Sequence, residues 1–187
     1  MRASPLVAGG LALLLGSASP AGACSFDGLA LDLATAHPDS LDVAIAMQGA
    51  YEQRRIPKPI PLPGGFGLRR VLQVLGKLNE ALNRTPGQDG FHLLLIESGL
   101  WVRYRAEGNS LRAEPHVARP SPDEPTVITG EGVLLALQQG RFSLDDALAI
   151  GLLRIRAPSP QRERIVEQWY LATSTTMAQP HTAPLEQ

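Results

Sequence analysis

Hydrophobic residues recur every three or four positions over residues 66–84, and the pattern changes to alternation over residues 91–96. The first spacing is typical of an amphipathic helix with one apolar stripe. The second is typical of a β-strand, in which Phe91, Leu93 and Leu95 would share one apolar face. A helix is therefore expected to lead into a sheet that buries one of its faces.

Two turn signals extend the strand at 91–96 into a three-stranded meander. Ser98-Gly99 predicts a two-residue hairpin, which would place Leu95 opposite Val102. A second turn at Gly108-Asn109 would start a third strand that runs from Ser110 to about Val117. The apolar residues of the first two strands fall on one face in this register, as a half-buried sheet requires.

The same register places His92, Arg105 and Arg112 in one row on the opposite face of the meander. Like charges in adjacent positions repel unless solvent or an anion screens them. Two interpretations follow: a patch that holds an anion or an acidic headgroup, or a solvated arginine-rich surface.

The later part of the chain alternates short strands and helices. Strands are predicted at 126–129 and 152–156, separated by a helix over 131–139 and a shorter helix after Ser143. The Ser143 hydroxyl is placed to cap that shorter helix in a capping box with Asp146. A last helix begins at Ser159-Pro160.

The stretch from 126 to 156 resembles the C-terminal half of a sterol carrier protein 2-like domain. The matching pieces are the helix that ends at Gly140-Arg141, the capped helix from Ser143, and the run from Gly151 to Ile155. The helix and meander upstream fit the same order of elements, so the resemblance covers residues 66–171. It implies an α+β fold: a single mixed or antiparallel sheet of about five strands, with helices packed on one face.

The resemblance also implies an apolar cavity between helices and sheet that binds or carries a lipid or another apolar-tailed molecule. Carriage of this kind needs no catalytic residue, because burying each methylene contributes about 0.8 kcal/mol. A packed core would serve an alternative role as a protein-interaction module. The candidate lining residues are the inward apolar groups of the late helices and the last strand: Leu134, Leu137, Phe142, Leu148, Leu153, Ile155, Val166 and Trp169.

Composition excludes several other classes of function. A formal net charge of −1 argues against a protein whose main role is to neutralise nucleic-acid phosphates. The single cysteine forms no internal disulfide, and the sequence has no metal-binding motif. Neither a nucleophile motif nor a nucleotide-binding motif is present, so we expect a protein that is not an enzyme and needs no cofactor.

The first 23 residues have the pattern of a secretory signal peptide: Arg2, an apolar run from Leu6 to Leu15, and Ala21-Gly22-Ala23. The run is far shorter than the about 20 residues that span a bilayer. We therefore expect export, with the bacterial periplasm as the compartment. Cys24 would become the first residue, either as a free thiol or as a lipidated cysteine that anchors the protein to a membrane.

Two segments flank the expected domain of residues 66–171. Residues 24–65 contain an alanine-rich helical section and then alternating prolines, which favour an extended spacer over the domain surface. Residues 172–187 are polar and aperiodic, which predicts disorder.

Overall fold

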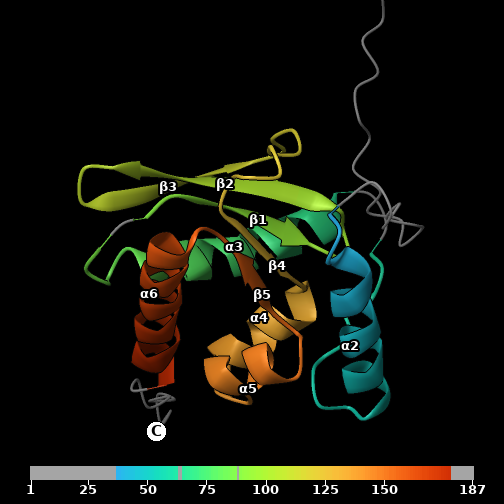
Figure 1. Ribbon diagram of the computed structural model, residues 1–187. Coiled ribbons are helices and arrows are strands. Elements are labelled where there is room, and N and C mark those ends of the chain that lie inside the picture. The colour runs from blue at the N-terminus through green and yellow to red at the C-terminus, as the bar shows by residue number, and fades with distance from the viewer. Residues whose placement is uncertain (1–36, 63–64, 88, 178–187) are drawn as a thin grey trace, which may run out of the picture.

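A computed structural model of the protein describes residues 37–62, 65–87 and 89–177 (Figure 1). The expected signal peptide and Cys24 lie outside these residues. Five strands form one sheet in the order β3-β2-β1-β4-β5. Their bounds are β1 Phe91–Leu95, β2 Leu100–Glu107, β3 Ser110–Pro115, β4 Thr126–Thr129 and β5 Arg154–Arg156.

The sheet is mixed, because β1 pairs parallel with β4 while every other pair is antiparallel. This arrangement confirms the predicted α+β class with a single five-stranded sheet. The helices of the described chain are α2 Ser40–Glu52, α3 Phe66–Leu82, α4 Glu131–Gln138, α5 Leu144–Ala149 and α6 Ser159–Met177.

Helices α3, α4 and α6 cover the sheet face that carries Phe91 and Leu93. The ring of Phe91 contacts Trp169 of α6, with ring centroids 5.9 Å apart. Helix α2 lies against the opposite face at β4 and β5, where Asp39, the residue before α2, pairs with Arg154 and Arg156. The sheet is therefore sandwiched at its β4–β5 end and covered by helices on one face elsewhere.

The predicted two-residue hairpin is wrong by two positions. Strand β1 ends at Leu95, which pairs with Leu100, and Leu93 lies opposite Val102. The backbone N–H of Ile96 donates instead to the carbonyl of Thr129 in β4, 2.9 Å away. The pairing of β1 with β2 therefore ends at Leu95, one residue before the predicted end of the strand. Because the register slips by an even number, the predicted inward face is preserved.

Helix α2 belongs to the same hydrophobic core as the sheet. Val43, Met47 and Ala50 are buried in that core, whereas Leu41 and Ile45 are 54% and 63% exposed. Ile56, at the start of the proline-rich segment, is buried as well. The segment is thus anchored to the domain, consistent with a spacer that crosses its surface.

Helix α6 continues to Met177, six residues beyond the expected end of the domain at residue 171. Its added turn is not a polar overhang, because Ala172 and Thr173 are both buried. The Thr173 hydroxyl donates to the Trp169 carbonyl 3.0 Å away. The hydrophobic pattern at this end of the helix is weak because Ala172 and Thr173 are small and one of them is polar.

Gly132 in α4 lies so close to the proline-rich segment that no side chain fits. A β-carbon there would lie 2.3 Å from the Pro57 carbonyl oxygen, so backbone would have to move. Gly132→Ala should therefore lower the free energy of unfolding by about 2 kcal/mol, as overpacking does. Gly76→Ala, in α3 with open space around it, is the control and should raise stability by about 0.5–1 kcal/mol. Urea denaturation measures both changes, and equal effects would contradict the close packing.

Candidate functional site

A small space lies where α3, α4 and α6 meet beneath the sheet. We call it the three-helix space. Its lining is mostly apolar, and the lining residues are Leu78, Ala81, Leu134, Leu137, Gln138, Trp169, Ala172 and Thr173. Its volume is about 10 Å³, which is room for one water molecule. In this conformation the interior is packed and no acyl chain fits.

Two residues that line the three-helix space each have a buried polar atom without a hydrogen-bond partner. The indole Nε1–H of the fully buried Trp169 is a donor, and Oε1 of Gln138 is an acceptor. Leaving a buried polar group unsatisfied costs about 1–3 kcal/mol, so such atoms are few in folded proteins. A hydroxyl or carboxyl group of a ligand could satisfy such an atom.

Gln138 separates the three-helix space from a surface groove of about 600 Å³ between α3 and α4. Its Nε2 donates to the Val74 carbonyl 3.0 Å away, which ties α4 to α3 at this point. Gln138 is therefore the residue that borders both the three-helix space and the surface groove.

Only three of the predicted lining residues line the three-helix space: Leu134, Leu137 and Trp169. The other five contribute to the core or its edge. Phe142 carries the guanidinium of Arg55 over its ring at 4.8 Å, and Ile155 pairs with Val127 within the sheet. Leu153 is fully buried, whereas Leu148 and Val166 are partly buried against the core. The α3 side of the space, formed by Leu78 and Ala81, was not predicted from the sequence. Leu78 nevertheless lies in the amphipathic helix predicted over residues 66–84.

The predicted row of His92, Arg105 and Arg112 is not assembled, because the shifted register places His92 opposite Arg103. Arg105 and Arg112 do pair across β2 and β3, but each has an acidic partner, Glu114 and Glu107 respectively. His92 itself is buried, and its Nδ1 has no partner. The three side chains therefore do not form one anion patch.

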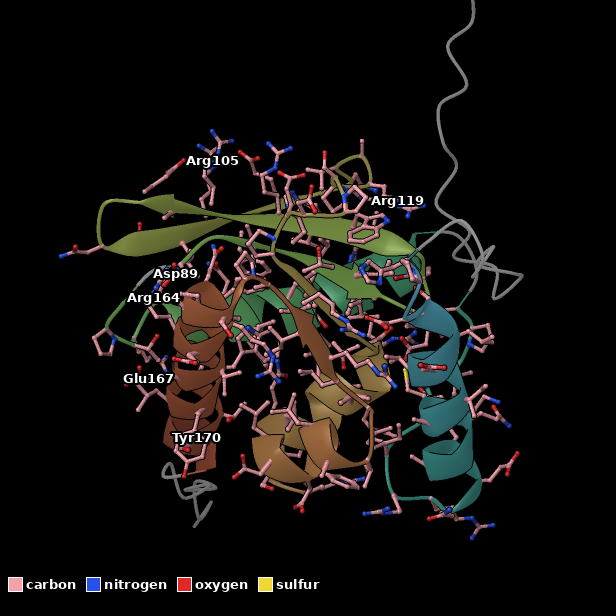
Figure 2. All side chains as sticks on the ribbon, viewed as in Figure 1. Asp89, Arg105, Arg119, Arg164, Glu167 and Tyr170 are labelled. Carbon is pink, nitrogen blue, oxygen red and sulfur yellow. The ribbon has the colours of Figure 1, made fainter. Side chains whose placement is uncertain are left out.

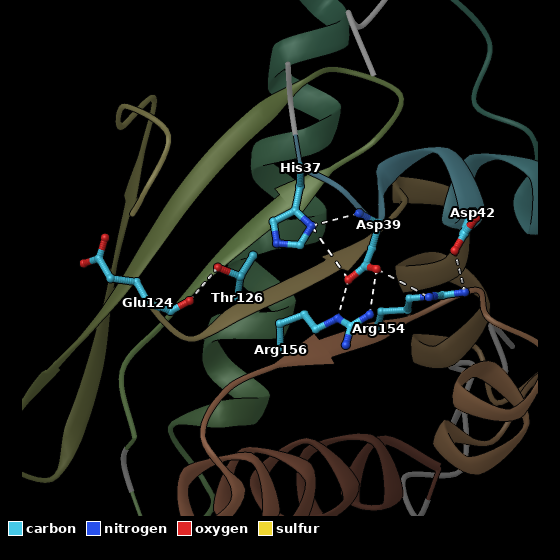
Figure 3. Close-up of polar contacts among 7 residues, drawn as sticks. All are labelled: His37, Asp39, Asp42, Glu124, Thr126, Arg154 and Arg156. Carbon is cyan, nitrogen blue, oxygen red and sulfur yellow. Dashed lines mark hydrogen bonds and ion pairs between the residues drawn. The ribbon is translucent and has the colours of Figure 1, made fainter. Parts of the chain in front are cut away.

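A polar cluster that the sequence did not indicate joins the start of α2 to β5 (Figure 3). Both oxygens of Asp39 accept from Arg156, with Nη2 to Oδ1 at 2.7 Å. The hydrogen bond from Arg156 holds the pKa of Asp39 below its usual value. His37 Nδ1 accepts from the Asp39 backbone N–H at 3.1 Å, and burial lowers the pKa of His37. His37 is thus a neutral imidazole with its proton on Nε2.

Acidification should destabilise the fold through two histidines. Burial is the main cause that lowers the pKa of both His37 and His92, so the unfolded chain binds their protons more tightly. The free energy of unfolding should therefore fall as the pH drops below about 6.5, the value of an unperturbed histidine. Urea denaturation at about pH 7 and about pH 5 measures this fall. A His37→Gln/His92→Gln double variant should show a smaller one, and an equal fall would contradict the assignment.

Another group of polar side chains caps helix α4 from a distant part of the chain. The Glu97 carboxylate, in the β1–β2 turn, accepts from the backbone N–H groups of Glu131 and Gly132 at 2.8 and 3.1 Å. It also accepts from the Tyr51 hydroxyl at 2.5 Å. Burial raises the pKa of Glu131 although Arg70 donates to it at 2.5 Å. These contacts bind the turn, α2 and α4 together.

Two features are absent from the described residues, 37–62, 65–87 and 89–177. None of their helices is long and apolar enough to cross a membrane. Nor do they contain a group of three or more His, Cys, Asp or Glu side chains that could hold a metal ion.

No family model and no curated protein matches the sequence. The solved structures to which the chain is similar are sterol carrier protein 2 and SCP2-like domains. Sterol Carrier Protein 2 Like 2 from Aedes aegypti is 15% identical with a TM-score of 0.41; the match covers 53% of this chain and 95% of that one. UbiJ-SCP2, a ubiquinone synthesis protein, is 17% identical with a TM-score of 0.39, covering 57% and 93%. A sterol carrier protein 2 is 16% identical with a TM-score of 0.36, covering 56% and 94%.

Proposed function

We propose that the protein binds the apolar tail of a lipid between α3, α4 and α6, without catalysing a reaction. The observation that carries this proposal is that two residues lining one mostly apolar space, Trp169 and Gln138, hold an unpaired buried donor and an unpaired buried acceptor. The space is too small for a lipid tail, so binding requires the helices to separate. A bound carboxyl or hydroxyl group could then satisfy such an atom, and the tail would replace helix-to-helix contacts.

Few polar contacts hold helix α6 to the rest of the domain. Among the described residues, its side-chain hydrogen bonds to other parts of the chain are those of Arg164 with Asp89, at 2.7 and 3.0 Å (Figure 2). This exposed pair lies near the first turn of α6, whereas Trp169 and Ala172 hold the helix by apolar contacts. A lipid tail supplies equivalent apolar contacts, at about 0.8 kcal/mol for each methylene buried, and can offset the cost of opening.

We further propose that the protein acts outside the cytoplasm, as the N-terminal sequence indicates, so that its ligand would be a lipid of the envelope. The alternative role, a non-catalytic interaction module, is favoured by one observation. Leu41 and Ile45 are exposed one turn apart on α2, where a protein partner could cover them.

Uptake of a fluorescent fatty acid by the mature protein, together with native mass spectrometry of the purified protein, tests the proposal. We expect co-purified lipid or saturable uptake. Trp169→Phe removes the buried donor and should weaken uptake about tenfold, the value of one hydrogen bond. Tyr170→Phe changes the neighbouring, half-exposed ring and should leave uptake unchanged.

A lipid-free mass with no uptake would overturn the proposal and favour the interaction module. Equal uptake by wild type and Trp169→Phe would show that lipid binds elsewhere.

A further inference from the structure

A second pocket lies on the other side of the sheet from the three-helix space. We call it the outer pocket. Its volume is about 290 Å³, close to the lower limit for small-molecule sites. Trp101 of β2, Thr126 of β4 and Arg156 of β5 contribute from the sheet. The remaining lining residues come from the start of α2 and from the loop after β3: His37, Pro38, Asp39, Arg119, Pro120, Ser121 and Pro122.

The loop wall of the outer pocket is held in shape by its own hydrogen bonds. The Ser121 N–H donates to the Glu124 carboxylate at 2.7 Å, and the Glu124 N–H donates back to the Ser121 carbonyl at 3.0 Å. Thr126 Oγ1 donates to the Glu124 carbonyl at 2.9 Å, and the Val117 N–H donates to the Trp101 carbonyl at 3.3 Å. The pocket is therefore preformed, so a ligand would have little ordering cost to overcome.

The polar groups of the outer pocket favour an anion. Asp39 is the one carboxylate in its lining, and both its oxygens already accept from Arg156. No described residue accepts from Nη1 of Arg156, and Nε2 of His37 is a further donor. The lining holds two guanidinium groups, Arg119 and Arg156, beside this one carboxylate. Figure 2 shows Arg119 on the side of the sheet away from α4, α5 and α6.

The rest of the outer pocket is apolar and flat. The Trp101 indole and the rings of Pro38, Pro120 and Pro122 form most of its lining beside the cationic groups. Planar rings stack well on an indole and on proline, and a carboxylate or phosphate accepts from guanidinium hydrogens. We infer that the outer pocket binds a small molecule with an aromatic or similarly flat body and one carboxylate or phosphate group.

The two tryptophans report the two sites separately, because Trp101 lines the outer pocket and Trp169 the three-helix space. Benzoate and phenyl phosphate are titrated into the ¹⁵N-labelled protein, and benzyl alcohol serves as the neutral probe. We expect saturable shifts of the Trp101 indole N–H signal with at least one anion, weaker binding of benzyl alcohol, and no shift of Trp169. Saturation with benzoate alone assigns a carboxylate, and with phenyl phosphate alone a phosphate.

Arg119→Gln should weaken anion binding about tenfold or more, as loss of a charge-assisted hydrogen bond does. Arg105→Gln removes the same charge from the same side of the sheet, outside the pocket, and should have no effect. The inference is overturned if neither anion shifts the Trp101 signal at about 10 mM, where even millimolar affinity would be visible. It is also overturned if both variants weaken binding equally, because the interaction would then be general attraction to positive charge. Lipid uptake is measured separately with the fluorescent fatty acid, so either proposal can fail alone.

Discussion

Glu97→Ala is expected to lower the free energy of unfolding by about 3 kcal/mol. The substitution removes the carboxylate that caps α4, since the N-cap residue itself, Gly130, has no side chain to do so. Loss of a cap costs about 1–2 kcal/mol. The Tyr51 hydroxyl also loses its acceptor in a partly buried position, which costs about 1–3 kcal/mol more.

Equilibrium unfolding in urea measures this effect. Glu80→Ala is the matched control, because Glu80 is an exposed carboxylate in an i,i+4 pair with Arg84, 3.9 Å apart. Such pairs contribute about 0.3–0.5 kcal/mol, so the control should change little. If Glu97→Ala destabilises the protein no more than Glu80→Ala, Glu97 does not join α2, α4 and the β1–β2 turn as described.

Locking α6 onto α3 is expected to abolish lipid uptake. Ala81 and Ala172 line the three-helix space from these two helices and can both be replaced by cysteine. Cys24→Ser removes the one native thiol. Since the ligand needs the opened state, a disulfide that depletes this state should weaken uptake in proportion, by at least about tenfold.

Reduction provides the control for the lock, because the oxidised and reduced proteins have the same side chains in the space. Disulfide formation is quantified by thiol titration, and uptake of the fluorescent fatty acid is measured before and after dithiothreitol. Recovery on reduction is the expected result. Equal uptake in both states would mean that the tail does not enter between α3 and α6.

Local sequence signals were sufficient for most of the helices and strands. The Ser143 hydroxyl accepts from the Asp146 N–H at 3.0 Å, as the capping box predicts. This contact was predictable because its two residues are only three positions apart in the sequence. The inward face of β1 was also predictable, since alternation assigns faces whatever the register. The strand pairing was not, because the bond from Ile96 to Thr129 joins residues 33 positions apart along the chain.

The sites depend on contacts that no local pattern reveals. Glu97 caps a helix that begins 34 residues later, and Asp39 pairs with an arginine 117 residues away. The eight predicted lining residues are all apolar and mostly buried, yet only three meet at the three-helix space. Hydrophobic pattern specifies which side chains leave water, because burial depends on their area. Which of them border an unfilled space, and which polar atoms remain unpaired beside it, depends on how α3, α4 and α6 pack against one another.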